Sequence, residues 1–219
     1  MRRGCYLTKA LQLTDQLLSA TLMRRSMMFV RKCAWTVYGC GIGGQSMELD
    51  KRTALRIKTM VDSGLIWYRH VHPWADQIIE REEQPPAWLL DVTVQRYTPA
   101  MSGCIGAYVY SEPFQTFSGG EVDAEHLACL FIRYERGEIS WATFLRAAGE
   151  FADGANGDWL CEDFYEMLTS LEDAEYSTNI TAEQASRVRD RLAIALKTME
   201  PLYREFLGYF RRALAQGPA

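Results

Sequence analysis

From position 47 to the C-terminus, apolar residues recur at intervals of three and four, the spacing of one face of an α-helix. The clearest stripes are Ala185, Val188, Leu192, Ala195, Leu196 and Met199, followed by Tyr203, Phe206, Leu207, Phe210 and Leu214. Thr181 and Gln184 match a capping box, the sequence signature of a helix N-terminus. Pro201 falls between the two stripes, and proline interrupts the hydrogen bonds of a helix interior. We therefore predict helix over 181–215, with a break or bend near Pro201.

Two shorter stripes begin the patterned region. Asp50 is positioned to cap a helix that ends near Gly64, with an apolar face of Ile57, Met60 and Val61. A second stripe consists of Trp67, Val71, Trp74 and Ile78. Pro73 lies inside this stripe, so we expect the second helix to be bent there or to begin there.

Three further stripes lie in the middle of the chain. Their apolar faces are Leu127, Leu130, Phe131 and Tyr134; Trp141, Phe144, Leu145 and Ala148; and Leu160, Phe164, Leu168 and Leu171. Gly137 is expected to end the first helix, and Ser140 and Asp158 to cap the second and third. The residues of the third stripe are expected to face inward.

Residues 85–120 are less regular. We favour a helix over 86–96, after Pro85 and Pro86, and leave 99–117 open between helix and strand because short apolar runs fit both. No period of the solenoid kind is present. The predicted fold class is therefore all-α, a single globular bundle-like domain of about six or seven helices over 47–219.

Charge divides the chain near Met47. Residues 1–46 contain seven basic side chains and one acidic one, whereas residues 47–219 contain seventeen basic and twenty-seven acidic ones. We predict that 1–46 is a basic, glycine-ended extension that is disordered or absent from the mature protein, with the true start at Met1 or Met47. A transit-like segment and a structural head are the alternatives, whereas interruptions by Gln12, Asp15 and Gln16 disfavour a secretory signal. Residues 47–219 are predicted to form an acidic helical domain.

A glycine cluster closes the extension. Gly39, Gly41 and Gly44 match G-x-G-x-x-G, the pattern that lets backbone amides approach a pyrophosphate in dinucleotide-binding folds. The alternation of strands and helices that such a fold requires does not follow, so the cluster is interpreted as a linker. No cofactor is predicted.

The paired histidines are the most plausible metal ligands in the sequence. If a helix begins at Pro73, His70 and His72 lie in extended chain, face the same side and have Asp76 as a third candidate ligand. Aromatic residues surround the pair, and partly buried, hydrogen-bonded histidines are the plainer interpretation. Metal binding is left open, and a metal-assisted enzyme that uses the His70/His72 region is kept as an alternative function.

Other catalytic patterns are weak. The six cysteines form no C-x-x-C pair, which together with apolar neighbours of Cys129 and Cys161 favours a reducing, cytoplasmic location. A nucleophile pair of Cys104 or Cys129 with His126 has no support from spacing, and no G-x-S-x-G motif occurs. We predict no catalytic residue and lean against an enzyme.

The charge of 47–219 suggests a function in binding. An acidic surface favours a basic protein partner through electrostatic complementarity, so we predict a binding or regulatory module. A structural or oligomeric helical protein is the second alternative, and homo-oligomerisation is left open. The net charge of -4 gives no attraction to nucleic acid, and no apolar run is long enough to span a membrane, so neither partner is expected.

Overall fold

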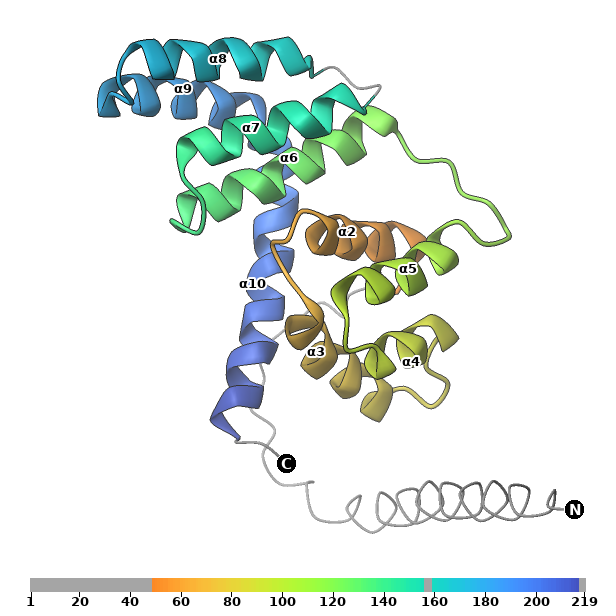
Figure 1. Cartoon of the computed structure of the whole chain (residues 1–219). Helices are drawn as coiled ribbons and strands as arrows, with labels where there is room; N and C mark the ends of the chain where they lie inside the picture. The colour runs from red at the N-terminus through yellow and green to blue at the C-terminus, as the bar shows by residue number, and fades with distance from the viewer. Residues whose placement is uncertain (1–48, 156–158, 217–219) are drawn as a thin grey trace, which may run out of the picture. The chain divides into compact units, whose positions relative to one another are not determined.

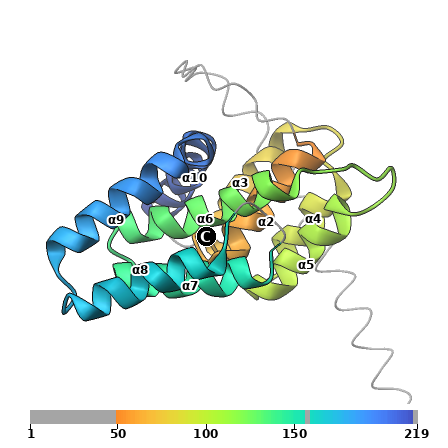
Figure 2. The ribbon, with the colours of Figure 1, turned by 90° about the horizontal axis from the view of Figure 1, so that it is seen from above.

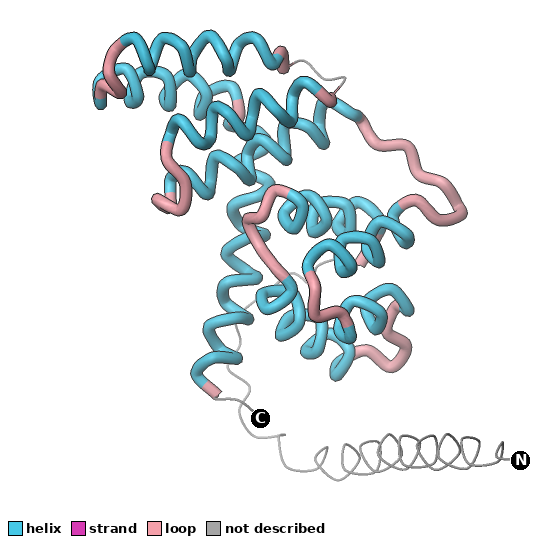
Figure 3. The backbone as a smooth tube through the Cα atoms, viewed as in Figure 1, coloured by secondary structure: helices cyan, strands magenta, loops and turns pink. Residues whose placement is uncertain are grey.

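The computed structural model describes residues 49–155 and 159–216. The chain divides between Ser46 and Met47 into two units, and every described residue belongs to the second. The predictions for the basic extension, its glycine cluster and Cys5, Cys33 and Cys40 therefore lie outside the described residues. All regular secondary structure in the described ranges is helical, which confirms the all-α class (Figures 1 and 3). The helices are α2 (Lys51–Asp62), α3 (Tyr68–Arg81), α4 (Ala87–Val94), α5 (Thr98–Val109), α6 (Gly119–Glu135), α7 (Trp141–Asp153), α8 (Cys161–Asp173), α9 (Thr178–Arg191) and α10 (Ala193–Ala215).

The described part of the chain holds nine helices rather than six or seven. The first additional helix is α5, in the stretch 99–117 that the sequence left open. The second arises because the predicted 181–215 helix divides into α9 and α10 at Leu192. The favoured helix over 86–96 is confirmed as α4.

Two details of the C-terminal prediction are wrong, namely a break at Pro201 and the capping box. The helix breaks at Leu192, and Pro201 lies inside α10, where its side chain is exposed. Thr181 and Gln184 do not form a capping box, because α9 begins after Ser177 and Thr181 donates its hydroxyl to the Ser177 carbonyl. Gln184 is instead buried.

Of the two alternatives for the stripe around Pro73, a helix that begins at the proline is wrong. The helix begins at Tyr68 and includes Pro73 as an interior residue, so it does not start at the proline. His70 and His72 consequently lie on a helix and not in extended chain. On a helix, side chains two residues apart point in different directions.

Local caps explain why several other helix ends were predicted correctly. Asp50 Oδ1 accepts a hydrogen bond from the Thr53 amide at 2.8 Å, and Ser140 Oγ accepts one from the Thr143 amide at 3.1 Å. Gly137 follows α6 with φ of +71°, a left-handed conformation that glycine adopts without a steric penalty. Asp158 lies outside the described residues. Leu160 at the N-cap of α8 is 58% exposed, contrary to the prediction that it faces inward.

The helices of residues 49–216 pack in two groups. One contains α2 to α5, in which α2 packs on α5 and α4 lies between α3 and α5; the other contains α6 to α9, packed as consecutive neighbours. The long helix α10 contacts both groups, through α3 and through α6, and α2 contacts α6 directly (Figures 1 and 2). Within the described ranges, no helix is both long and apolar enough to cross a membrane.

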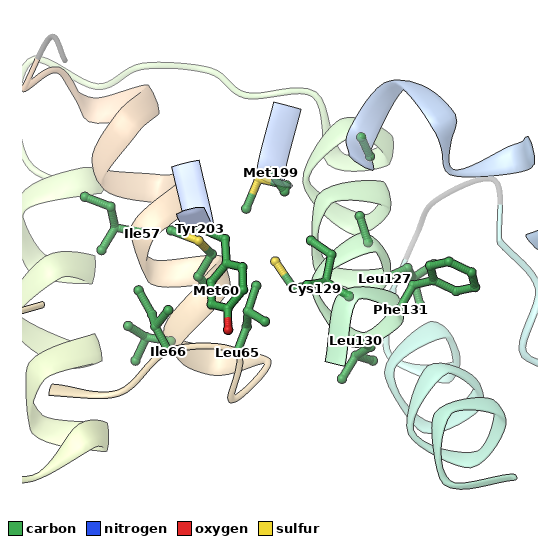
Figure 4. Packing of buried hydrophobic residues seen from close by; sticks show 14 of the residues in the cluster. Ile57, Met60, Leu65, Ile66, Leu127, Cys129, Leu130, Phe131, Met199 and Tyr203 are labelled. Carbon is green, nitrogen blue, oxygen red and sulfur yellow. The ribbon is translucent and has the colours of Figure 1, made fainter. Parts of the chain in front are cut away.

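The core is continuous across these contacts. Figure 4 shows Met60 from α2, Cys129 from α6 and Met199 and Tyr203 from α10 converging on one apolar region. Met60, Cys129 and Met199 have no exposed surface, and Tyr203 is 4% exposed. Sulfur-containing side chains fill irregular gaps well, which suits a place where three helices meet.

Candidate functional site

The two paired histidines are held apart in separate environments. The His70 ring lies 4.5 Å from the Phe210 ring of α10, measured between centroids. His72 Nδ1 is 3.1 Å from Arg96 Nη1, and its ring packs against Tyr68. Burial lowers the pKa of both imidazoles and so favours their neutral forms.

Asp76 does not complete a metal site with them. Burial raises the pKa of Asp76, and the nearby His72 partly offsets that effect. Among the described residues, no three His, Cys, Asp or Glu side chains come close enough together to hold a metal ion. The structure therefore does not bring the ligands proposed from the sequence into one site.

The thiol–imidazole pair also lacks the required arrangement. Cys129 is fully buried, and burial raises the pKa of its thiol, which disfavours the nucleophilic thiolate. The His126 ring stacks on Phe151 with 3.8 Å between centroids, and burial lowers its pKa to about 4. Both side chains are held in apolar packing.

A buried ion-pair cluster joins α2 to α6 and was not foreseen. Glu125 is 3% exposed, and its Oε1 accepts hydrogen bonds from Arg52 Nη2 at 2.8 Å and from Arg56 Nε at 2.9 Å. Arg52 also lies 3.3 Å from Glu121. Because all these charges are paired within the fold, we assign the cluster a structural role.

The negative charge of the domain is concentrated in one stretch. Residues 147–186 contain ten acidic residues and no Lys, Arg or His. The other positions of 47–219 contain seventeen acidic and seventeen basic residues and are therefore neutral overall. The net charge of -10 thus belongs to forty consecutive residues, which include the end of α7, all of α8 and the first part of α9.

An open groove of about 710 Å³ lies in this acidic stretch. α8 supplies most of its lining, Ile180 of α9 completes it, and the two helices meet at the turn that joins them (Figure 2). It is lined by Glu162, Tyr165, Glu166, Thr169, Ser170, Asp173, Ala174 and Ile180. We call these eight residues the acidic groove. Its lining combines three carboxylates with an aromatic ring and two aliphatic side chains.

The three carboxylates of the acidic groove form no salt bridge with the described residues. Of the salt bridges between described residues, the one on α8 joins Asp163 to Arg191 and leaves Glu162, Glu166 and Asp173 unpaired. The last turn of α8 contains Glu172 and Asp173 but no basic residue. Negative charge at a helix C-terminus interacts unfavourably with the helix dipole and destabilises the helix by about 0.3–1 kcal/mol per charge.

Tyr165 is positioned by a glycine on the neighbouring helix. A Cβ atom at Gly149 of α7 would lie 3.0 Å from Cε1 and Cζ of the Tyr165 ring, so any larger residue there would displace the ring. The ring is 40% exposed. Partial burial, with Glu150 and Asp153 nearby, raises the pKa of Tyr165, which keeps its hydroxyl protonated as a donor.

The turn between α8 and α9 has an unusual backbone. Glu175 and Tyr176 have φ of 49° and 59°, the left-handed region that non-glycine residues seldom adopt. The Tyr176 amide donates to the Leu171 carbonyl and the Glu175 amide to that of Glu172, which defines a Schellman motif. Gly64 and Gly137 occupy the equivalent position after α2 and α6. After α8 the position is held by an acidic residue beside the acidic groove.

Comparison with protein-family models, curated proteins and solved structures found no match to the chain. The acidic groove therefore rests on its own geometry and charge. A count of charged residues in successive windows would have located the stretch 147–186 from the sequence. The groove itself depends on how α9 packs on α8 and carries no local sequence signal.

Proposed function

We propose that the chain is a binding module whose acidic groove docks a basic segment of a partner protein. The observation that carries this proposal is the coincidence of an open groove with the forty residues that hold the whole net charge of 47–219. Carboxylates scattered over a solvated surface would not be expected to line a single concave site. The cytoplasmic location predicted from the cysteines belongs to this proposal, and the packing of Cys129 as a small apolar side chain supports it.

The spacing of the carboxylates suggests the form of the partner. Glu162, Glu166 and Asp173 follow one another at four and seven residues, about 6 Å and 10 Å along the helix axis at 1.5 Å per residue. Lys or Arg side chains with a similar repeat would meet all three. An amphipathic basic helix has this repeat, and its apolar side chains would contact Tyr165, Ala174 and Ile180.

The two kinds of contact are expected to contribute differently. Exposed ion pairs contribute about 0.2–1 kcal/mol each and are screened by salt. They would mainly accelerate association and select for positive charge. Tyr165 is the natural anchor, because a rigid aromatic ring buries a large area with little loss of entropy.

Fluorescence anisotropy with a labelled amphipathic peptide tests the proposal. The probe carries lysine at every fourth position and leucine on the same side, and its counterpart carries glutamate in place of lysine. The groove variant combines Glu162→Gln, Glu166→Gln and Asp173→Asn. The control variant combines Glu80→Gln, Glu82→Gln and Glu83→Gln, three exposed acids at the end of α3 and just after it. Both variants lose the same net charge.

We expect the groove variant to bind the lysine peptide about tenfold more weakly, since three lost pairs of about 0.5 kcal/mol sum to roughly 1.5 kcal/mol. The control variant should bind nearly as well as the unaltered chain, and the glutamate peptide should not bind. Equal weakening in both variants would show that the peptide responds to net charge alone and would refute the proposed site.

A further inference from the structure

A second surface of the domain is built from a stretch that contains few charged residues. Residues 84–117 contain three charged side chains, Asp91, Arg96 and Glu112, in thirty-four positions. Several large apolar side chains in this stretch are exposed to solvent. They are Leu90 (44%), Val94 (69%), Tyr97 (67%), Tyr110 (61%) and Phe114 (77%). This surface is separate from the acidic groove, because it is built from α4, α5 and the loop after α5.

Helix α5 has two apolar faces. Its inner face packs on α2 and buries Met101, Ile105 and Val109 completely. Its outer face presents Gly103 and Ala107 to solvent, and Tyr97 and Tyr110 stand next to the two ends of the helix. A Cβ atom placed on Gly103 would meet no atom within 4 Å, so the space above it is open. The outer face is therefore a shallow strip between two tyrosines, about 20 Å long at 1.5 Å per residue.

Helix α4 repeats this arrangement beside α5. Trp88, Leu89 and Val92 face the core, whereas Leu90 and Val94, one helical turn apart, are exposed. The two helices pack against each other and lie side by side in Figures 1 and 2. A helix that is apolar on both faces normally has a neighbour on each side. We call Leu90, Val94, Tyr97, Gly103, Ala107, Tyr110 and Phe114 the α4–α5 face.

Three exposed aromatic side chains supply about half of the area that one partner of a stable dimer buries. Tyr97, Tyr110 and Phe114 expose roughly two-thirds of side chains of about 200 Å² each, which gives about 400 Å² from three rings. A stable interface buries about 800 Å² on each partner. Leu90, Val94 and the backbone-rich strip at Gly103 and Ala107 add to that sum. Single exposed apolar residues are common, but a patch of this size usually marks an interaction site.

We propose that a second copy of the chain covers the α4–α5 face and forms a two-fold symmetric dimer. Asp91 and Arg96 have opposite charges, and Lys51 of α2, which donates to the Ser111 and Pro113 carbonyls, offsets Glu112 between them. The face therefore selects neither a basic nor an acidic partner, and two copies do not repel each other there. A two-fold interface brings the same surface of both copies together. The small side chains of Gly103 and Ala107 let the backbones of two α5 helices approach closely, with the tyrosines packing at the ends.

Sedimentation velocity of the full chain over a concentration series tests the dimer. We compare the unaltered chain with Ala107→Glu, which places like charges at the interface of both copies. The matched control is Ile194→Glu, because Ile194 is 86% exposed on α10, away from the α4–α5 face. Tyr97→Lys is a second interface variant in case Ala107→Glu folds poorly, and circular dichroism checks that each variant retains its helix content.

The unaltered chain and Ile194→Glu should both dimerise, and the dimer should persist in high salt because its contacts are apolar. The interface variants should raise the dimer dissociation constant about tenfold or more. A chain that stays monomeric at high-micromolar concentration, or a dimer that Ile194→Glu weakens as much as Ala107→Glu does, would overturn the proposal. Binding of the lysine peptide to the acidic groove is measured separately, so either proposal can fail alone.

Discussion

Gln184 illustrates how a residue's role can depend on partners far away in the sequence. Its Oε1 accepts a hydrogen bond from Trp141 Nε1 at 2.8 Å, and its Nε2 donates to the Met167 carbonyl at 2.9 Å. These contacts join α7, α8 and α9. The sequence placed Gln184 in a capping box because that pattern is defined by residues three apart, whereas its true partners are 43 and 17 residues away. Glu125 was missed as a core residue for the same reason.

His126 gives a prediction for the pH dependence of stability. Burial lowers its pKa to about 4 in the folded chain, whereas the unfolded value is near 6.5. As pH falls, the unfolded chain therefore takes up a proton at His126 before the folded chain does. The stability that depends on a neutral His126 is complete above pH 6.5 and is lost progressively between about pH 6.5 and 4. We expect the free energy of unfolding to fall by about 2 kcal/mol from this group between about pH 7.5 and 5.

Urea unfolding of the unaltered chain and of His126→Leu at several pH values checks this prediction. The leucine variant should have a shallower pH dependence, whatever its absolute stability. Burial also lowers the pKa of His70 and His72. In His126→Leu the free energy of unfolding should therefore still fall as pH falls, but less steeply. An unchanged slope in His126→Leu would contradict the assignment.

At the scale of elements, sequence prediction succeeded where a helix has a local cap and one apolar face. Helices α2 and α7 have Asp50 and Ser140 as N-caps, and both caps form the expected hydrogen bonds. The stretch 99–117 stayed open because α5 is apolar on both faces, so its composition shows no helical period. The break at Leu192 was missed since the apolar stripe continues through it, and Pro201 was the stronger local signal.

A substitution in the turn after α8 is expected to raise stability and to weaken peptide binding. Glu175 has a left-handed backbone at the position where Gly64 and Gly137 stand in the other two turns. A non-glycine residue in this conformation costs about 1 kcal/mol, so Glu175→Gly should raise the free energy of unfolding by about that amount. The same change removes a negative charge beside the acidic groove and should slightly weaken binding of the lysine peptide. Thermal unfolding and anisotropy measure the two effects; a less stable Glu175→Gly chain would contradict this account.

Gly149 gives a second prediction at this scale. Alanine is favoured over glycine inside a helix by about 1 kcal/mol, but the added Cβ at Gly149 would lie 3.0 Å from the Tyr165 ring. Because that ring is partly exposed, it can move away from the added Cβ with little loss of stability. Gly149→Ala should therefore keep its melting temperature within a few degrees yet bind the lysine peptide more weakly. Gly208→Ala, also in a helix and with only Arg212 Nη1 near the added Cβ at 3.5 Å, is the control that should leave peptide binding unchanged.

For the whole molecule, the sequence predicted an acidic domain but not where its charge lies. Summing charge over 47–219 hides the fact that seventeen acids and seventeen bases outside 147–186 balance one another. Some of these acidic and basic residues form salt bridges with one another, as Glu125 does with Arg52 and Arg56. The two proposed binding surfaces consequently differ in kind: one is acidic and sensitive to salt, and the other is apolar and insensitive to it.

The division of the chain near Met47 predicts that residues 1–46 are dispensable for folding. A chain that begins at Met47 retains the Asp50 cap, all nine described helices and the described core from Ala54 to Phe206. We expect it to melt within about 2 °C of the full chain, because a change of 1 kcal/mol shifts the melting temperature of a domain of this size by about 2–4 °C.

Removing the seven basic residues and one acidic residue of 1–46 also makes the chain more acidic overall. The shortened chain should then bind the lysine peptide faster at low salt, through stronger long-range attraction, with the difference fading as salt screens it. Differential scanning calorimetry and stopped-flow fluorescence measure the two quantities. A fall in melting temperature of more than about 4 °C would show that residues 1–46 stabilise the folded domain by roughly 1 kcal/mol or more.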